Sequence, residues 1–263
     1  MDIHKPKPWH GLREFLKEYV IIVVGVLTAL AAEAGVEWLH WRRLAGQHEA
    51  ELRASGAQML SVAVERIAAV DCIRGELKRM AVALRSPGPH WKGTNPGMDV
   101  TPNAYLEPGL FIPTRPWPAS DWETTLSDGT AAHMSHGHVA VYAYLYKVAI
   151  AAQERQLEEQ AVRVELTPLA FDRELTPAEK AHYLALVARM DDRERLLGAM
   201  ARSAIQEAGY YAGLRPDPAD LRVRMEGLRR DYPTGCVHDV DVEAMATRKP
   251  PLAPPGATRE ARP

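Results

Sequence analysis

A run of fourteen uncharged residues, 19–32, constrains the fold of this chain more than any other feature. A membrane-spanning helix needs about 20 mostly apolar residues to cross about 30 Å of hydrocarbon. Extending the run to residues 15–39 gives that length, and Lys17 is close enough to one end to reach the headgroups. Tyr19 lies near one end, and Trp38 and Trp41 lie near the other, as interfacial aromatic residues do. We therefore predict a transmembrane helix over residues 15–39, after a cytoplasmic lead-in at 1–14.

The same stretch permits a second interpretation. An apolar run followed by Ala32-Glu33-Ala34 is also typical of a secretory signal with its cleavage site. The long mixed-charge segment in front and the exit rich in Trp and Arg favour an anchor.

One face of the predicted span carries small residues and a carboxylate: Gly25, Ala29, Ala32 and Glu33. Gly25, Ala29 and Glu33 are spaced by four, which lets another helix approach closely and gives it a polar partner. This pattern indicates an interface with a second copy or with another membrane protein. The alternative is that the helix leaves the bilayer near Glu33 and has no partner.

Charges around the span favour a cytoplasmic N-terminus by a single residue. Four basic residues precede the span and three follow it: Lys5, Lys7, Arg13 and Lys17, then Arg42, Arg43 and Arg53. The bulk of the chain would then lie in the periplasm, anchored in a bacterial inner membrane. Cys72 and Cys236 would form a disulfide there, and the alternative is a pair of buried free thiols.

The remaining chain has the composition of a folded domain, with 46% hydrophobic and 25% charged residues. Its net charge of −2 argues against general nucleic-acid binding. The chain has no P-loop, dinucleotide-binding, nucleophile-elbow or zincin motif, so kinase, nucleotide-binding and common hydrolase activities have no support. We predict no cofactor, and the sequence does not identify a small-molecule ligand.

Apolar residues recur at helical spacing through most of the chain, which predicts an all-α fold. The expected helices cover residues 46–85, 120–126, 136–165, 177 to Gly209 or Gly213, and 218–230. The first continues from the span as a long amphipathic helix, and the set packs as a small bundle within a domain at 40–247. Capping signals stand at Ser120 with Glu123, at Thr176 with Glu179, and at Asp217. No segment reads as a strand.

Two segments rich in proline interrupt this pattern. Residues 86–118 contain eight prolines among several aromatic residues, and we expect a long ordered loop packed on the bundle. Residues 248–263 are expected to be disordered.

Three groups of residues are candidates for a chemical site. His133, His136 and His138 are spaced by three and two, which matches no established metal site, so they are weak candidates. The carboxylates of two helices alternate with arginines and indicate solvated faces: Glu154, Glu158, Glu159, Glu165, Asp191, Asp192 and Glu194. The pairs Tyr210-Tyr211 and Trp117/Trp122 are typical of the edge of a core.

Two segments resemble a known group of proteins. The opening KPKPWHGLREFLKEYVIIVVGVLTALAAEAGVEWLHWR and the later RPWPASDWETTLSDGTAAHM are similar to segments of a family of uncharacterised bacterial single-span inner-membrane proteins. The resemblance implies an inner-membrane anchor with an extracytoplasmic helical domain, and it implies no activity and no catalytic residues.

The function that the sequence favours is an interaction or sensing module that acts by contact in the cell envelope. The alternative is an unrecognised enzyme or metal-dependent binder centred on residues 86–138.

Overall fold

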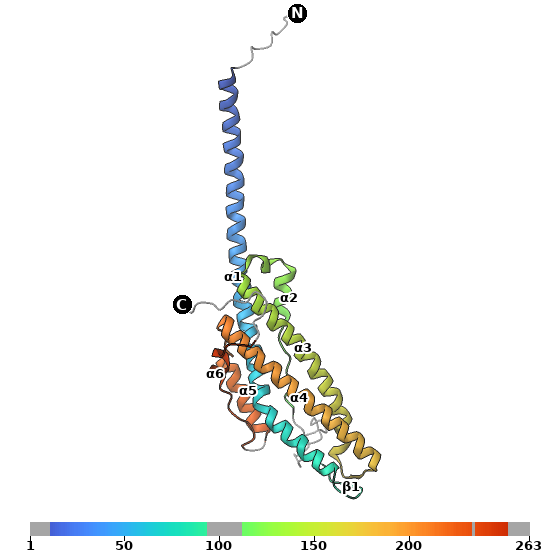
Figure 1. The fold of residues 1–263 in the computed structure, drawn as a ribbon. Helices are drawn as coiled ribbons and strands as arrows, with labels where there is room; N and C mark the ends of the chain where they lie inside the picture. Colours follow the sequence, from blue (N-terminus) through green and yellow to red (C-terminus); the bar gives the residue numbers. More distant parts are fainter. Residues whose placement is uncertain (1–10, 94–111, 233–234, 252–263) are drawn as a thin grey trace, which may run out of the picture. The chain divides into compact units, whose positions relative to one another are not determined.

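The computed structural model describes residues 11–93, 112–232 and 235–251, and the chain is almost entirely helical (Figure 1). In these residues the α-helices are α1 Leu12–Leu84, α2 Ser120–Ser127, α3 His136–Leu166, α4 Pro177–Ala212, α5 Pro218–Asp231 and α6 Val242–Thr247. Two 3₁₀ helices, η1 Thr130–His133 and η2 Thr167–Ala170, adjoin α3. The prediction of an all-α fold is confirmed.

The chain divides into two compact units, residues 1–47 and 48–263. In the first unit, the described residues form the beginning of α1, and their large apolar side chains are exposed from Phe15 to Leu39. Among the described residues, α1 is the one helix long and apolar enough to cross a membrane. Arg42 lies over the ring of Trp38, 5.1 Å from its centroid.

The second unit buries a core between the later part of α1, α3 and α4. The helices α3 and α4 run antiparallel, joined through η2 and a short strand (Figure 1). The apolar residues that recur at helical spacing in this part of α1 are buried: Leu60, Val64, Val70, Leu77, Met80 and Leu84. Ile67, which belongs to the same series, is half-buried. From residue 59 to residue 70, α1 is buried on nearly all sides, so it is the central helix of this unit.

Most of the predicted helix ends are confirmed by local hydrogen bonds. Thr176 and Glu179 form a reciprocal capping box, and the side chains of Ser135 and Asp217 accept from the backbone N–H groups of His138 and Asp220. Gly213 ends α4 with a φ of 63°, a conformation that glycine adopts without strain.

The capping box predicted at Ser120 is wrong. Ala119 is the N-cap residue of α2, and Ser120 already lies in the helix without making a cap hydrogen bond. Glu123 instead accepts a hydrogen bond from the Tyr146 hydroxyl of α3. Glu123 therefore makes a tertiary contact and does not take part in a capping box.

The prediction of no strands is also wrong in detail. β1 His90–Trp91 pairs antiparallel with β2 Arg173–Glu174. Each strand is two residues long, too short to show an alternating pattern. The ladder closes the end of the bundle where the Trp91 indole donates to the Leu169 carbonyl at 2.8 Å.

The structure describes only the two ends of the segment 86–118, so the long packed loop stays a prediction. Trp91, Ile112 and Trp117 are buried, while residues 94–111 lie outside the described residues. The expected disorder from residue 248 does not apply at its start, since Gln206 donates to the carbonyls of Arg248 and Lys249. The rest of that segment, residues 252–263, lies outside the described residues.

Helix α6 was not predicted, and it packs directly on α4. A Cβ atom built on Gly209 would lie 2.3 Å from the Cβ of Ala246, which no real pair of carbons tolerates. Glycine at this position therefore allows the two helices to meet.

We expect Gly209→Ala to lower the free energy of unfolding by about 1–3 kcal/mol, because the added methyl must push α6 away. Gly227→Ala on α5 is the matched control, since its Cβ would have Arg230 Nη2 as nearest atom at 3.8 Å. The control should be neutral or stabilising by up to about 1 kcal/mol. Thermal unfolding of both variants measures the difference, and equal midpoints would contradict the packing described.

Candidate functional site

A buried ionic cluster joins α1, α3 and α4. Arg66 of α1 donates from Nη2 to Oε1 of Glu159 on α3 and, at 2.7 Å, to Oε1 of Glu194 on α4. The three side chains are 4%, 1% and 0% exposed. Removing charges from water costs several kcal/mol per ion, so each must be paired where it lies.

Two further arginines surround the neighbouring carboxylate of α1, that of Glu65. Glu65 is buried and accepts from Arg115 Nη2 at 3.1 Å and from Arg224 Nη1 at 3.2 Å. Arg224 of α5 also donates to Asp220 at 2.8 Å. The Arg115 backbone is held by Gln156 of α3, which accepts from its N–H and donates to its carbonyl. The Arg66 cluster and the contacts of Glu65 together form an ionic layer. This layer connects the loop before α2 to four helices, α1, α3, α4 and α5.

The pKa values of Glu194 and Arg66 are shifted by burial and by each other. Burial raises the pKa of Glu194 well above its ordinary value, while Arg66 lowers it and the neighbouring Glu159 raises it further. Burial alone would lower the pKa of Arg66, but Glu194 and Glu159 raise it. Four carboxyl groups face three guanidinium groups here, so the layer has one more acidic group than basic groups.

The prediction that these carboxylates lie on solvated faces is wrong for Glu159 and Glu194. Glu154, Glu165 and Asp192 are exposed as expected, and Glu158 and Asp191 are half-buried. The two buried carboxylates have their arginine partner on α1, about a hundred residues earlier in the chain, and spacing within one helix cannot show such a partner.

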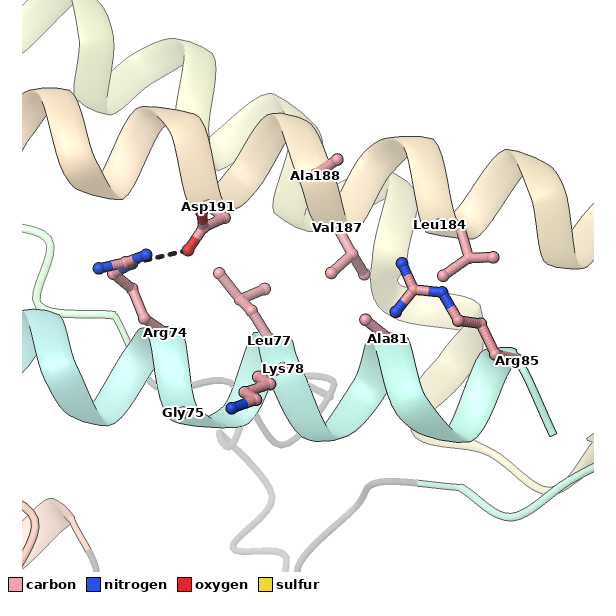
Figure 2. A pocket seen from close by; sticks show the side chains of 10 residues that line it. All are labelled: Arg74, Gly75, Leu77, Lys78, Ala81, Arg85, Leu184, Val187, Ala188 and Asp191. Atoms are coloured by element: carbon pink, nitrogen blue, oxygen red, sulfur yellow. Dashed lines mark hydrogen bonds and ion pairs between the residues drawn. The ribbon is translucent and has the colours of Figure 1, made fainter.

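An open groove of about 440 Å³ lies beside this layer between α1 and α4 (Figure 2). Its floor and walls are mainly apolar, and cationic side chains line it: Arg74 and Lys78 of α1, and Arg85 directly after the end of α1. Arg74 Nε donates to Asp191 Oδ1 at 2.7 Å across the groove. Asp191 precedes Glu194 by one helical turn, and its charge contributes to the raised pKa of Glu194.

The three candidate histidines are not brought together. His133 lies in η1, His136 is the first residue of α3, and His138 Nδ1 lies 3.0 Å from Glu49 Oε1 of α1. No group of three or more ligand side chains able to hold a metal ion exists in the described part of the chain.

His48 is a buried histidine that sequence reasoning missed. Its Nε2 lies 3.0 Å from Asp128 Oδ2, and its Nδ1 lies 3.0 Å from Thr125 Oγ1. Thr125 is completely buried and donates to the Asp121 carbonyl, so it offers no accessible nucleophile. The contacts attach α2 to α1.

Cys72 and Cys236 are brought together, with their Cα atoms 5.3 Å apart and their sulfur atoms at bonding distance. The aromatic pairs form no ligand site. Trp117 and Trp122 are buried, the cavity beside Trp122 measures about 20 Å³, and the rings of Tyr210 and Tyr211 pack edge to face.

No described residue from elsewhere in the chain packs on the small-residue face of the apolar segment. Ala29, Ala32 and Glu33 are exposed, and a Cβ on Gly25 would meet no atom within 4 Å. The interface at Gly25, Ala29, Ala32 and Glu33 remains a prediction.

A further buried carboxylate, Glu207 of α4, has no ion-pair partner among the described residues. It is 5% exposed, and its Oε2 has no hydrogen-bond partner among the described residues. Burial raises its pKa to about 7.

Comparison of this chain with protein families, curated proteins and solved structures found no match. The candidate sites therefore rest on the geometry described above.

We expect Arg66→Ala to cost about 3–5 kcal/mol of unfolding free energy, because it leaves two carboxylates buried without a cation. Arg79→Ala is the matched control on the same helix, since Arg79 makes an exposed pair with Glu76, and it should cost less than about 1 kcal/mol. Chemical denaturation measures both. Adding Glu159→Gln and Glu194→Gln to Arg66→Ala should recover part of the loss, and no recovery would contradict the charge argument.

We expect Glu207→Gln to stabilise the protein at alkaline pH. Between the ordinary carboxyl pKa of 4.5 and the folded value of about 7, the folded state binds more protons than the unfolded state, so stability falls as pH rises. The variant should gain on the order of 1–3 kcal/mol at pH 8 and almost nothing at about pH 4.5. Unfolding midpoints across this range test it, with exposed Glu154→Gln as control; a gain independent of pH would contradict the assignment.

Proposed function

We propose that this chain is a single-span protein of a bacterial inner membrane whose helical domain senses or contacts another molecule in the periplasm. The observation that carries the proposal is that one helix, α1, contains the exposed apolar segment and also contributes Arg66 to the ionic layer and Arg74 to the groove. The span would cover residues 15–39, with the preceding residues in the cytoplasm.

The apolar segment supports the anchor. Exposed side chains of Ile21, Leu27 and Leu30 would be unfavourable in water and favourable in hydrocarbon. Arg42 stacked over Trp38 at the end of this segment resembles an interfacial belt.

The cysteine pair supports the periplasmic location. Disulfides persist in oxidising compartments and are rare in the cytosol, so two cysteines at bonding distance favour translocation of the domain. The positively charged residues before the span give the same orientation.

The groove and the layer beside it support sensing. Arg74 and Asp191 form an ion pair in the groove wall, and both carry charge close to Glu194. An anion bound at Arg74 would change the electric field at Glu194, which is a local electrostatic event of the kind that switches use.

We expect a topology reporter fused after Pro263 to be active in the periplasm. Maleimide should fail to label Cys72 and Cys236 in the denatured wild-type chain until reductant is added, because the disulfide protects both thiols. A Cys72→Ser variant is the control, and its single thiol should label without reductant. A cytoplasmic reporter with both wild-type thiols labelled would reverse the proposed orientation and location.

A further inference from the structure

The groove between α1 and α4 has an apolar interior. Leu77 of α1 and Val187 of α4 face each other and form its closed floor, since they are only 1% and 4% exposed. Ala81, Leu184 and Ala188 supply its accessible apolar surface (Figure 2). Gly75 leaves the wall open, since a Cβ there would meet only Arg79 Nη1, at 3.9 Å. A hydrocarbon chain could lie along this surface and be removed from water.

The groove carries an excess of positive charge. Arg74 is paired with Asp191, while the side chains of Lys78 and Arg85 are exposed and have no ion-pair partner among the described residues. The Arg85 guanidinium reaches across the groove toward Leu184 (Figure 2). Three cations and one carboxylate line the groove, so its complement is an anion.

Size restricts the class of ligand. A volume of about 440 Å³ lies within the range of roughly 300–1,000 Å³ that is typical of small-molecule sites. An apolar surface next to two unpaired cations fits an amphiphile with one chain and one anionic head. The planar guanidinium of Arg85 matches a carboxylate in particular, because it can donate two parallel hydrogen bonds.

We propose that this groove binds a free fatty acid, with its carboxylate at Arg85 and its chain along Ala81, Leu184 and Ala188. The inference rests on the proposed sensing function and names its ligand class.

Photolabelling of the full chain tests the proposal. The protein is placed in phosphatidylcholine nanodiscs with palmitate that carries a diazirine near the end of its chain, and the adducts are mapped by mass spectrometry. We expect adducts at residues 77–81 and 184–188, in addition to adducts at 15–39. The adducts at 15–39 come from probe in the bilayer and are the internal reference for each sample.

Charge and shape variants give the decisive comparison. Lys78→Glu combined with Arg85→Glu should reduce groove labelling about tenfold relative to the reference, which corresponds to the loss of one strong charged contact. Ala188→Phe, which narrows the groove without changing charge, should also reduce it. Arg222→Glu on α5 is exposed and outside the groove, and it should leave labelling unchanged.

Two further arms identify the ligand. The methyl ester of the probe should label the bilayer segment and not the groove, because it lacks the carboxylate. Photoreactive phosphatidylglycerol should do the same, since the proposal assigns the groove to a free acid. Absent groove adducts, labelling unaffected by the charge variants, or equal labelling by the ester or the phospholipid would overturn the proposal. Each of these results can occur with the reporter still periplasmic, so it leaves the proposed topology standing.

Discussion

The guanidinium of Arg66 imposes the constraint on which the rest of the helical unit depends. A buried cation must have carboxylates within hydrogen-bond distance, and these come from Glu159 on α3 and Glu194 on α4. Rotating or sliding any of the three helices would leave a charge unpaired. The apolar contacts around the cluster supply most of the stability, since they are many and non-directional. The ionic contacts select one register among the packings that those apolar surfaces would tolerate.

Two acidic side chains of the layer share one cation. Glu194 and Glu159 contact the same arginine, and two ionised carboxylates so close together would repel each other without water to screen them. Burial raises the pKa of Glu194, and Asp191, which pairs with Arg74 across the groove, lies one turn before it on α4. The charges of Arg74 and Asp191 in the groove can consequently affect the pKa of the buried Glu194 directly, without a rearrangement of the backbone.

Helix α3 and the start of α4 could be predicted to within about a residue, because these limits depend on local chemistry, whereas the end of α4 was narrowed only to Gly209 or Gly213. Thr176 and Ser135 cap the nearest backbone N–H groups, and Gly213 stops α4. The buried state of Glu159 and Glu194 could not be predicted in this way, because their partner lies on α1. A signal was present in α1, where small residues lie on different sides of the helix close to Glu65 and Arg66: Ala63, Ala68 and Ala69. Small residues on several sides of a helix allow other helices to approach it, which favours burial of the charges among them.

Helix α1 meets two different requirements along its length. Around Leu27 its large side chains are exposed on every side, and around residues 59–70 they are buried on nearly every side. Both parts are apolar, and they differ in what covers them: no described residue from elsewhere in the chain covers the first, whereas α3, α4 and α5 cover the second. Charged residues distinguish the two, since Glu65 and Arg66 are buried where other helices supply counter-charges. Glu33 is exposed and has no such partner in the described part of the chain, and a carboxylate in that position needs either water or a polar group from another molecule.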